Sequence, residues 1–308
     1  MFFLLLSLLT HKVDSFHVKA CVRLNQDFLF QKALVPVDVI REHCQQVSDA
    51  VERYPWSIDV LEVLALNDVA PFTVLTEPPF IDRTKRSIFK SYVDYIGEAS
   101  NCQDISCIAM ELNSKLWDIR DPPIVFAPAD SNQLNSYGVE ETWERGNGSC
   151  TSMSVFLITA LRMLGVPSRL VGVPHWNLGV EKCPFGDASP ACGNHNWVEV
   201  FVAGQGWSFI DQRRPDEMTL PLNQSWFFPD WTKNLYPNNG NHSIYAVSFL
   251  NPFDLDPEYP IGDGVLEAEH FPMVWDWNNH QIPAWDVSGA YQSYEEEEES
   301  DRPIIKSS

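Results

Sequence analysis

An almost unbroken apolar run from Met153 to Leu164 is the feature that most constrains the fold of this chain. A surface helix shows one apolar stripe, whereas this run is apolar on almost every side, so it predicts a helix buried in a core. Gly165 and Pro167 follow the run and are expected to end that helix. A loop with two glycines precedes the run, so Cys150 is expected at or near the N-terminus of the buried helix.

This position favours chemistry at the sulfur of Cys150. Unpaired backbone N–H groups and the helix dipole at a helix N-terminus stabilise a thiolate relative to a thiol, and the thiolate is the nucleophile. The alternative is a buried and inert core residue, which is the usual situation of a free cysteine. The choice between the two depends on the residues that accompany Cys150.

Two β-rich segments downstream supply candidate partners. Segment 195–202 favours a strand, a glycine-bearing turn follows, and segment 207–211 predicts the returning strand of a hairpin. In such a ladder His195 and Asp211 fall near direct opposition, separated by a small register offset or a bulge. A carboxylate can then orient a histidine that faces the cysteine, which gives a nucleophile, a base and an orienting group.

Other residues compete for these roles. His175 is a rival base, but its polar surroundings, rich in proline and glycine, favour a surface or substrate-rim position. Asp187 and Asp216 are further carboxylates near the histidine segment. The backbone N–H of Cys150 is the expected first oxyanion donor. The side-chain oxyanion donors that remain open are Gln133, Trp143 and Asn147.

The segments around these residues resemble those of the transglutaminase-like superfamily. The similar segments are Gly148–Cys150 with Ala160–Gly172 for the cysteine, and Asn194–Val200 with Gly206–Asp211 for the histidine and aspartate. The core of the resemblance covers residues 140–215, and a looser similarity extends over residues 89–292. The resemblance implies a papain-like α+β fold with a Cys150, His195 and Asp211 triad. In that fold the cysteine begins a buried helix that packs on an antiparallel sheet carrying the other two residues.

The resemblance also implies thiol-dependent acyl transfer on protein or peptide carboxamides through a thioester at Cys150, with a primary amine as acceptor. Hydrolysis of the same thioester by an amidase or a peptidase stays open, and so does a binding or scaffold module without catalysis. The chain has 11 tryptophans, most of them expected in the core. Trp176, Trp197 and Trp207 are expected around the site as substrate-binding residues, with one or two of them as walls of the substrate channel.

No cofactor or metal is expected. The chain has no obvious calcium loop of alternating aspartate and asparagine residues. A zinc site is conceivable, but the close ligand pairs of such sites are absent. Its ligands would be His175, Cys183, Cys192 and His195. The net charge of −21 argues against nucleic-acid binding, which needs basic patches.

The N-terminus and the cysteines predict secretion or residence in the secretory lumen. Residues 2–9 are apolar but too few to span a membrane, and they resemble the core of a signal peptide with a cut after Ser15. With Cys150 set aside, the other cysteines suffice for three disulfides in an oxidising compartment. The expected pairs are Cys21–Cys44, Cys102–Cys107 and Cys183–Cys192, with Cys44 alternatively packed on a buried helix face. Glycosylation sequons occur at Asn147, Asn223 and Asn241, and the first is expected to be unused because it adjoins Cys150.

Four regions are expected along the chain. They are a signal peptide (1–15), a mainly helical region (16–120), a catalytic core with C-terminal strands (121–292) and an acidic disordered tail (293–308). Helices are predicted at 36–54, 83–99 and 104–117. Strands are predicted at 169–173, 196–202, 207–211, 244–250, 272–277 and 284–287.

Overall fold

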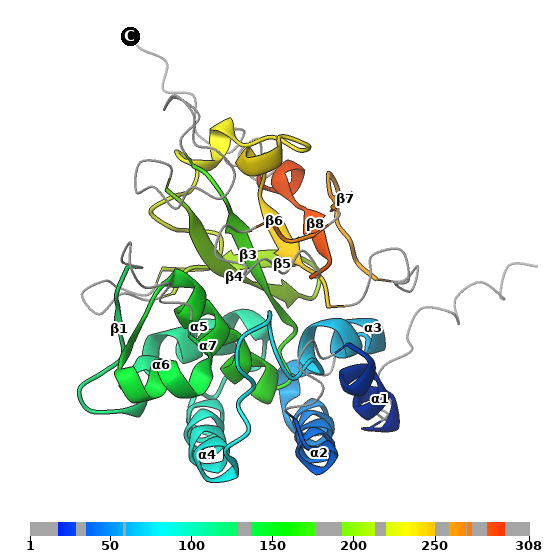
Figure 1. The fold of residues 1–308 in the computed structure, drawn as a ribbon, viewed down its shortest axis with the longest axis vertical. Coiled ribbons are helices and arrows are strands. Elements are labelled where there is room, and N and C mark those ends of the chain that lie inside the picture. Colours follow the sequence, from blue (N-terminus) through cyan, green and yellow to red (C-terminus); the bar gives the residue numbers. More distant parts are fainter. Residues whose placement is uncertain are drawn as a thin grey trace, which may run out of the picture.

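In the computed structural model, a layer of helices lies against one six-stranded antiparallel sheet (Figure 1). The structure describes residues 18–28, 35–57, 60–128, 137–176, 193–212, 220–249, 259–268, 270–272 and 282–292. The expected signal peptide and acidic tail lie outside these ranges. No helix within the described ranges is long and apolar enough to span a bilayer.

The helical layer contains the three helices predicted before the catalytic segment. The helices that precede Gly148 are α1 (Val18–Phe28), α2 (Val37–Arg53), α3 (Glu62–Leu64), α4 (Arg83–Ala99), α5 (Ile105–Lys115) and α6 (Val139–Arg145). Shorter helical turns are η2 (Pro55–Ser57), η3 (Ala65–Val69) and η4 (Leu116–Ile119). The local sequence explains where two of these helices begin. Asp82 caps α4 by accepting the backbone N–H of Lys85, and Asp104 caps α5 by accepting that of Cys107.

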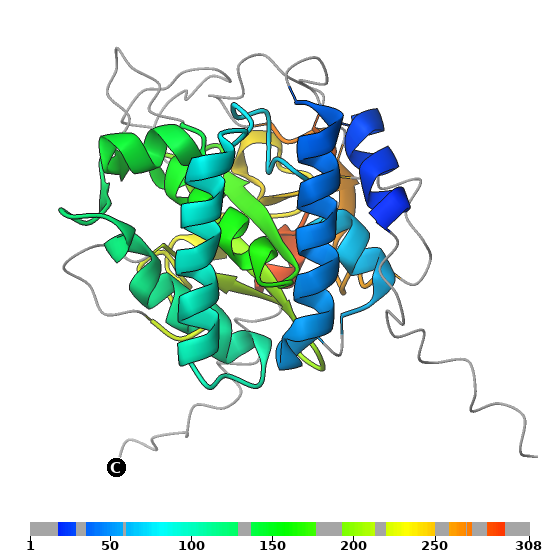
Figure 2. The same cartoon turned by 90° about the horizontal axis from the view of Figure 1, so that it is seen from below.

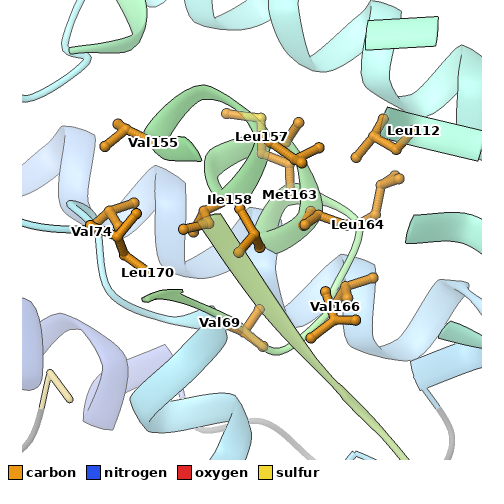
Figure 3. Packing of buried hydrophobic residues seen from close by; sticks show 14 of the residues in the cluster. Val69, Val74, Leu112, Val155, Leu157, Ile158, Met163, Leu164, Val166 and Leu170 are labelled. Carbon is orange, nitrogen blue, oxygen red and sulfur yellow. The ribbon is translucent and has the colours of Figure 1, made fainter. Parts of the chain in front are cut away.

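Helix α7 (Cys150–Met163) is the predicted buried helix. Every residue in it except Thr159 is buried. Helices α2, α4 and α5 pack around it, and its other side packs on the sheet (Figures 2 and 3). Ser149 caps its N-terminus and accepts the backbone N–H of Ser152. Gly165 follows its last turn with φ of +74°, a conformation that glycine adopts without strain.

The sheet has the strand order β5-β4-β3-β6-β8-β7, and all of its neighbouring pairs are antiparallel. Its strands are β3 (Ser168–Val173), β4 (His195–Val202), β5 (Gly206–Ile210), β6 (Tyr245–Val247), β7 (Leu266–Ala268) and β8 (Ala284–Asp286). A separate short parallel pair, β1 (Val125–Phe126) and β2 (Asn147–Gly148), leads into α7. Two short helical turns, η5 (Thr232–Asn234) and η6 (Gly240–His242), lie between β5 and β6. Most of the strand predicted at 272–277 lies outside the described residues.

Strand alternation divides the sheet residues between two faces. Leu170, Val198 and Val200 belong to the large core that α7 fills, whereas Val171 and Trp197 belong to a second core on the opposite face. Strands β3 and β4 are therefore apolar on both sides. This double burial fixes the position of β4, the strand that begins with His195.

Two of the three expected disulfides are present. Cys21–Cys44 joins α1 to α2 with a Cα–Cα distance of 5.8 Å, and Cys102–Cys107 closes the loop before α5 with a Cα–Cα distance of 5.5 Å. Cys44 also lies on the buried face of α2, so this residue is both disulfide-bonded and packed on a buried helix face. Cys183 and Cys192 lie outside the described residues.

Candidate active site

Cys150 is the first residue of α7 and is the free cysteine among the described residues. Its exposed fraction is 9%, so the sulfur lies at the edge of the core rather than on an open surface. The backbone N–H groups of Thr151 and Asn196 act on this sulfur and lower the pKa of the thiol. The N-terminal position predicted from the apolar run is confirmed.

His195 and Asp211 meet where β4 begins and β5 has just ended. The register pairs Val198 with Ile210, so Asp211 is one residue beyond the ladder and diagonal to His195 on the same face. His195 Nε2 lies 2.9 Å from Asp211 Oδ1. The small register offset expected from the sequence is thus present and produces the contact. Because Nε2 is engaged with the carboxylate, Nδ1 is the ring nitrogen left to act on the thiol of Cys150, whose pKa His195 lowers.

The carboxylate of Asp211 is held on several sides. Its Oδ1 also accepts the backbone N–H of Gln212 at 3.1 Å, and its Oδ2 accepts the hydroxyl of Ser225 at 3.0 Å. Its backbone carbonyl accepts the side-chain amide of Asn113 from α5 at 2.8 Å. The side chain of Asp211 is 12% exposed, and that of His195 is 7% exposed. The charge of the carboxylate is therefore poorly screened by water.

These contacts change the proton affinities of the cysteine and the histidine. Burial alone would raise the pKa of Cys150, but the hydrogen bond and positive charge of His195, with the two backbone N–H groups, hold that pKa below its usual value. Burial alone would lower the pKa of His195. The negative charge and hydrogen bond of Asp211, and then the contact with Cys150, raise it to about 9. The two shifts act together, because each of them stabilises a thiolate beside an imidazolium relative to the neutral pair.

Two polar residues that sequence reasoning missed lie behind the thiol. Asn196 Nδ2 donates to Thr151 Oγ1 at 2.8 Å and lies 4.0 Å from the sulfur of Cys150. Gln212 Nε2 donates to the carbonyl of Cys150 at 3.1 Å. Each of them follows a predicted site residue in the sequence, but no pattern marks it, because its partners are distant in the chain.

The tryptophans expected around the site are placed differently from one another. Trp176 stacks near His195, with ring centroids 6.3 Å apart, and is 5% exposed. Trp197 is fully buried and donates from Nε1 to the hydroxyl of Tyr291, so it supports the site from beneath. Trp207 pairs with Phe201, six residues or about 20 Å along β4 from His195. The expectation that Trp207 walls a substrate channel at His195 is therefore wrong.

Trp226 and Trp231 take the place that was expected for Trp207. Each is 41% exposed, and their ring centroids are 5.7 Å apart. The ring of Trp226 lies 5.2 Å from that of His195. These two rings form an exposed aromatic surface beside the histidine. They lie in a segment between β5 and β6 without strand periodicity, so alternation could not identify them.

The rival residues have other positions. The surface position predicted for His175 is wrong, since its exposed fraction is 1% and its ring lies beside that of His242. The ring of Trp143 packs against Phe89, and Asn147 Nδ2 donates to the carbonyl of Arg145, so neither contact identifies an oxyanion donor. The remaining alternatives lie outside the described residues. These are Gln133, Cys183, Asp187, Cys192 and Asp216.

Among the residues that the structure describes, no group of three or more histidine, cysteine, aspartate or glutamate side chains could hold a metal ion. Two ligands of the conceivable zinc site, Cys183 and Cys192, belong to the part that is not described.

Residues 98–212, which contain α5, α7 and strands β3 to β5, match the family model of the transglutaminase-like superfamily. This part of the chain is similar to the transglutaminase-like superfamily. Its papain-like α+β architecture, with a cysteine at the start of a buried helix against an antiparallel sheet, agrees with the prediction.

Three solved structures share limited similarity with this chain. A candidate cysteine protease from Cytophaga hutchinsonii is 10% identical (TM-score 0.28), and the match covers 43% of each chain. Red sea bream transglutaminase is 14% identical (TM-score 0.29), over 44% of this chain and 27% of that one. The periplasmic domain of TgpA from Pseudomonas aeruginosa is 17% identical (TM-score 0.28), over 54% and 51%. The match thus spans about half or less of each of those chains, and no curated protein matches this one in sequence.

Proposed function

We propose that this protein is a thiol-dependent acyl enzyme in which Cys150 attacks a carboxamide or peptide carbonyl. The observation that carries the proposal is the buried and hydrogen-bonded His195–Asp211 pair, whose histidine lowers the pKa of Cys150 in spite of burial. An inert core cysteine would have its pKa raised by burial alone. The contact between Cys150 and His195, a histidine whose pKa is raised, favours an enzyme over a scaffold module that keeps the fold without catalysis.

In the first half of the reaction, the thiolate of Cys150 forms a bond to the carbonyl carbon and the carbonyl oxygen takes the negative charge. The backbone N–H of Cys150, at the start of α7, is the proposed first oxyanion donor. His195 then gives its Nδ1 proton to the leaving nitrogen, the C–N bond breaks, and ammonia or an amine departs. The product is a thioester at Cys150 and a neutral imidazole that Asp211 holds in the Nε2–H tautomer.

In the second half, an acceptor attacks the thioester carbonyl and gives its proton to His195 Nδ1. Collapse of the intermediate breaks the C–S bond and restores the thiolate and imidazolium. A primary amine as acceptor gives an isopeptide cross-link, and water gives a carboxylic acid. We favour the amine, because transfer needs water kept from the thioester and the aromatic surface of Trp226 and Trp231 adjoins His195, where the acceptor loses its proton.

The proposed location is the secretory lumen or the outside of the cell. Two disulfides in the helical layer support it, because disulfides persist in oxidising compartments and are rare in the cytosol. Non-reducing peptide mapping of the mature protein tests it. Retention of residues 1–15 with every thiol free would refute it.

The activity is tested by incubating the protein with a glutamine-bearing protein and a labelled primary amine, without added calcium. Incorporation of the amine, with release of one ammonia per label, is expected for the wild type and absent in Cys150→Ala. Ammonia or peptide fragments without incorporation would move the assignment to an amidase or a peptidase. Equal incorporation by Cys150→Ala would refute the proposal.

A further inference from the structure

Gln212 touches all three parts of the proposed site. It follows Asp211 in the sequence and is 6% exposed. Its backbone N–H donates to Asp211 Oδ1 at 3.1 Å, the same oxygen that lies 2.9 Å from His195 Nε2. The carboxylate oxygen that orients the histidine is therefore itself oriented by Gln212.

The side chain of Gln212 reaches the other two parts. Its Nε2 donates to the backbone carbonyl of Cys150 at 3.1 Å and to that of Asn196, next to His195, at 2.8 Å. Ser154 Oγ, one turn into α7, is a third acceptor of the same amide nitrogen. An amide nitrogen has two N–H bonds, so both are used within this buried cluster. The bridge joins the first turn of α7 to the first residues of β4.

We infer that Gln212 is a positioning residue that sets the distance between the Cys150 sulfur and the imidazole of His195. The inference rests on the proposed role of these two residues. The N-terminus of α7 and the start of β4 belong to different layers, so no shared secondary structure fixes their separation. Among the described residues, the side chain of Gln212 links the two backbones, and the hydrogen bond from Asn196 Nδ2 to Thr151 Oγ1 assists it. A shift of 1 Å at a reacting atom is enough to reduce a rate by about 100-fold.

This role differs from that of Asp211. Asp211 raises the pKa of His195 through its charge, whereas Gln212 is neutral and acts on the separation. Loss of the Gln212 bridge should therefore weaken the bond between His195 and Cys150 and raise the pKa of the thiol, while the Asp211 charge still holds the pKa of His195 above its usual range.

The test compares two variants with a matched control. Gln212→Met keeps the length of the side chain and removes its donors, and Gln212→Asn keeps the amide but is one methylene too short to reach both carbonyls. Both keep the backbone N–H that holds Asp211. The control is Trp56→Phe, which removes the buried bond from Trp56 Nε1 to the carbonyl of Leu164 at the opposite end of α7.

The readouts are the pH dependence of iodoacetamide alkylation at Cys150 and the thermal midpoint. Both Gln212 variants should move the alkylation midpoint to higher pH by about one unit, equal to about tenfold slower alkylation below that midpoint. Trp56→Phe should lower the thermal midpoint without moving the alkylation midpoint. Gln212 variants that lose thermal stability and keep the wild-type alkylation profile would overturn the inference, because such a result indicates that Gln212 has a purely structural role.

The alkylation profile needs no substrate, so it separates this inference from the proposed function. A wild type without amine incorporation or hydrolysis, but with shifted profiles in both Gln212 variants, would reject the function and support the positioning role. A wild type that turns over, with unshifted variants, would do the reverse.

Discussion

Replacement of Asp211 by asparagine is the most direct test of the electrostatics of the site. The substitution keeps the size of the side chain and an oxygen within reach of His195, and it removes the charge. The charge and hydrogen bond of Asp211 are the largest causes that raise the pKa of His195, against the opposing effect of burial. In Asp211→Asn that pKa should therefore fall to 6.5 or below.

The magnitude follows from the two pKa values. The pKa of His195 of about 9, compared with 6.5 in the absence of perturbation, corresponds to about 3 kcal/mol at 1.36 kcal/mol per pH unit. The ratio of imidazolium to imidazole then changes by up to about 300-fold. Because the thiolate is stabilised by the adjacent imidazolium, the ratio of thiolate–imidazolium pairs to neutral pairs should fall by up to the same factor.

The assay is alkylation of Cys150 by iodoacetamide between pH 4 and 10, followed by mass spectrometry of the Cys150 peptide. In the wild type, alkylation should begin below the ordinary cysteine range, and acyl transfer should decline as the pH passes about 9, where His195 loses its proton. In Asp211→Asn the onset of alkylation should move to higher pH. Asp230→Asn is the matched control, since the side chain of Asp230 is 84% exposed. An unchanged profile in Asp211→Asn would refute the electrostatic reasoning.

Three further predictions concern stability and packing. Glu199→Gln should lower the free energy of unfolding in urea by about 3–5 kcal/mol, because it leaves the buried guanidinium of Arg169 without its 2.7 Å carboxylate partner. Glu141→Gln, at the exposed pair with Arg145, should lower the same free energy by at most about 0.5 kcal/mol. Similar losses in the two variants would contradict this prediction. His43 is buried and its pKa is lowered to about 3 by burial and then by the charge of Arg86, so its contribution to stability is complete above pH 6.5 and is lost as the pH falls from 6.5 towards 3. The free energy of unfolding of the wild type should therefore fall by up to about 5 kcal/mol between pH 6.5 and pH 3. In urea unfolding at pH 7 and at pH 4, His43→Asn, which cannot titrate, should show a measurably smaller loss than the wild type. Gly172→Ala should both destabilise the fold and raise the alkylation midpoint of Cys150, because the new Cβ would meet Asn196 Oδ1 at 2.2 Å; a stable protein with the wild-type alkylation profile would exclude this.

The parts of the fold that the sequence predicts are those governed by local physics. Helix α7 could be placed because a run that is apolar on all sides has no stable position except a core. Helices α4 and α5 begin at aspartates that cap them. Strands β4 and β5 follow from β-favouring residues around a glycine-bearing turn, and that hairpin alone brings His195 near Asp211.

The parts that could not be predicted depend on position along an element or on tertiary contacts. Alternation correctly puts Trp207 and Asp211 on one face of the sheet, but it does not tell how far along that face a residue lies from His195. His175 is buried against His242, a neighbour from a distant segment, although its own surroundings in the sequence are polar. The aromatic surface of Trp226 and Trp231 lacks any periodic signal.

The location of the site at the ends of three elements explains why polar residues accompany it. Cys150 begins α7, His195 begins β4, and Asp211 follows β5, so each side chain projects where regular backbone hydrogen bonding stops. Strand alternation then turns the residue after each strand-borne member towards the opposite face, which α7 covers. Asn196 and Gln212 occupy these positions, and both bond to the first turn of α7. Apolar residues there would bury the sheet equally well, but they would leave the cysteine helix free to move against the histidine strand. The two amides therefore convert an ordinary helix–sheet contact into a defined distance between the sulfur and the imidazole.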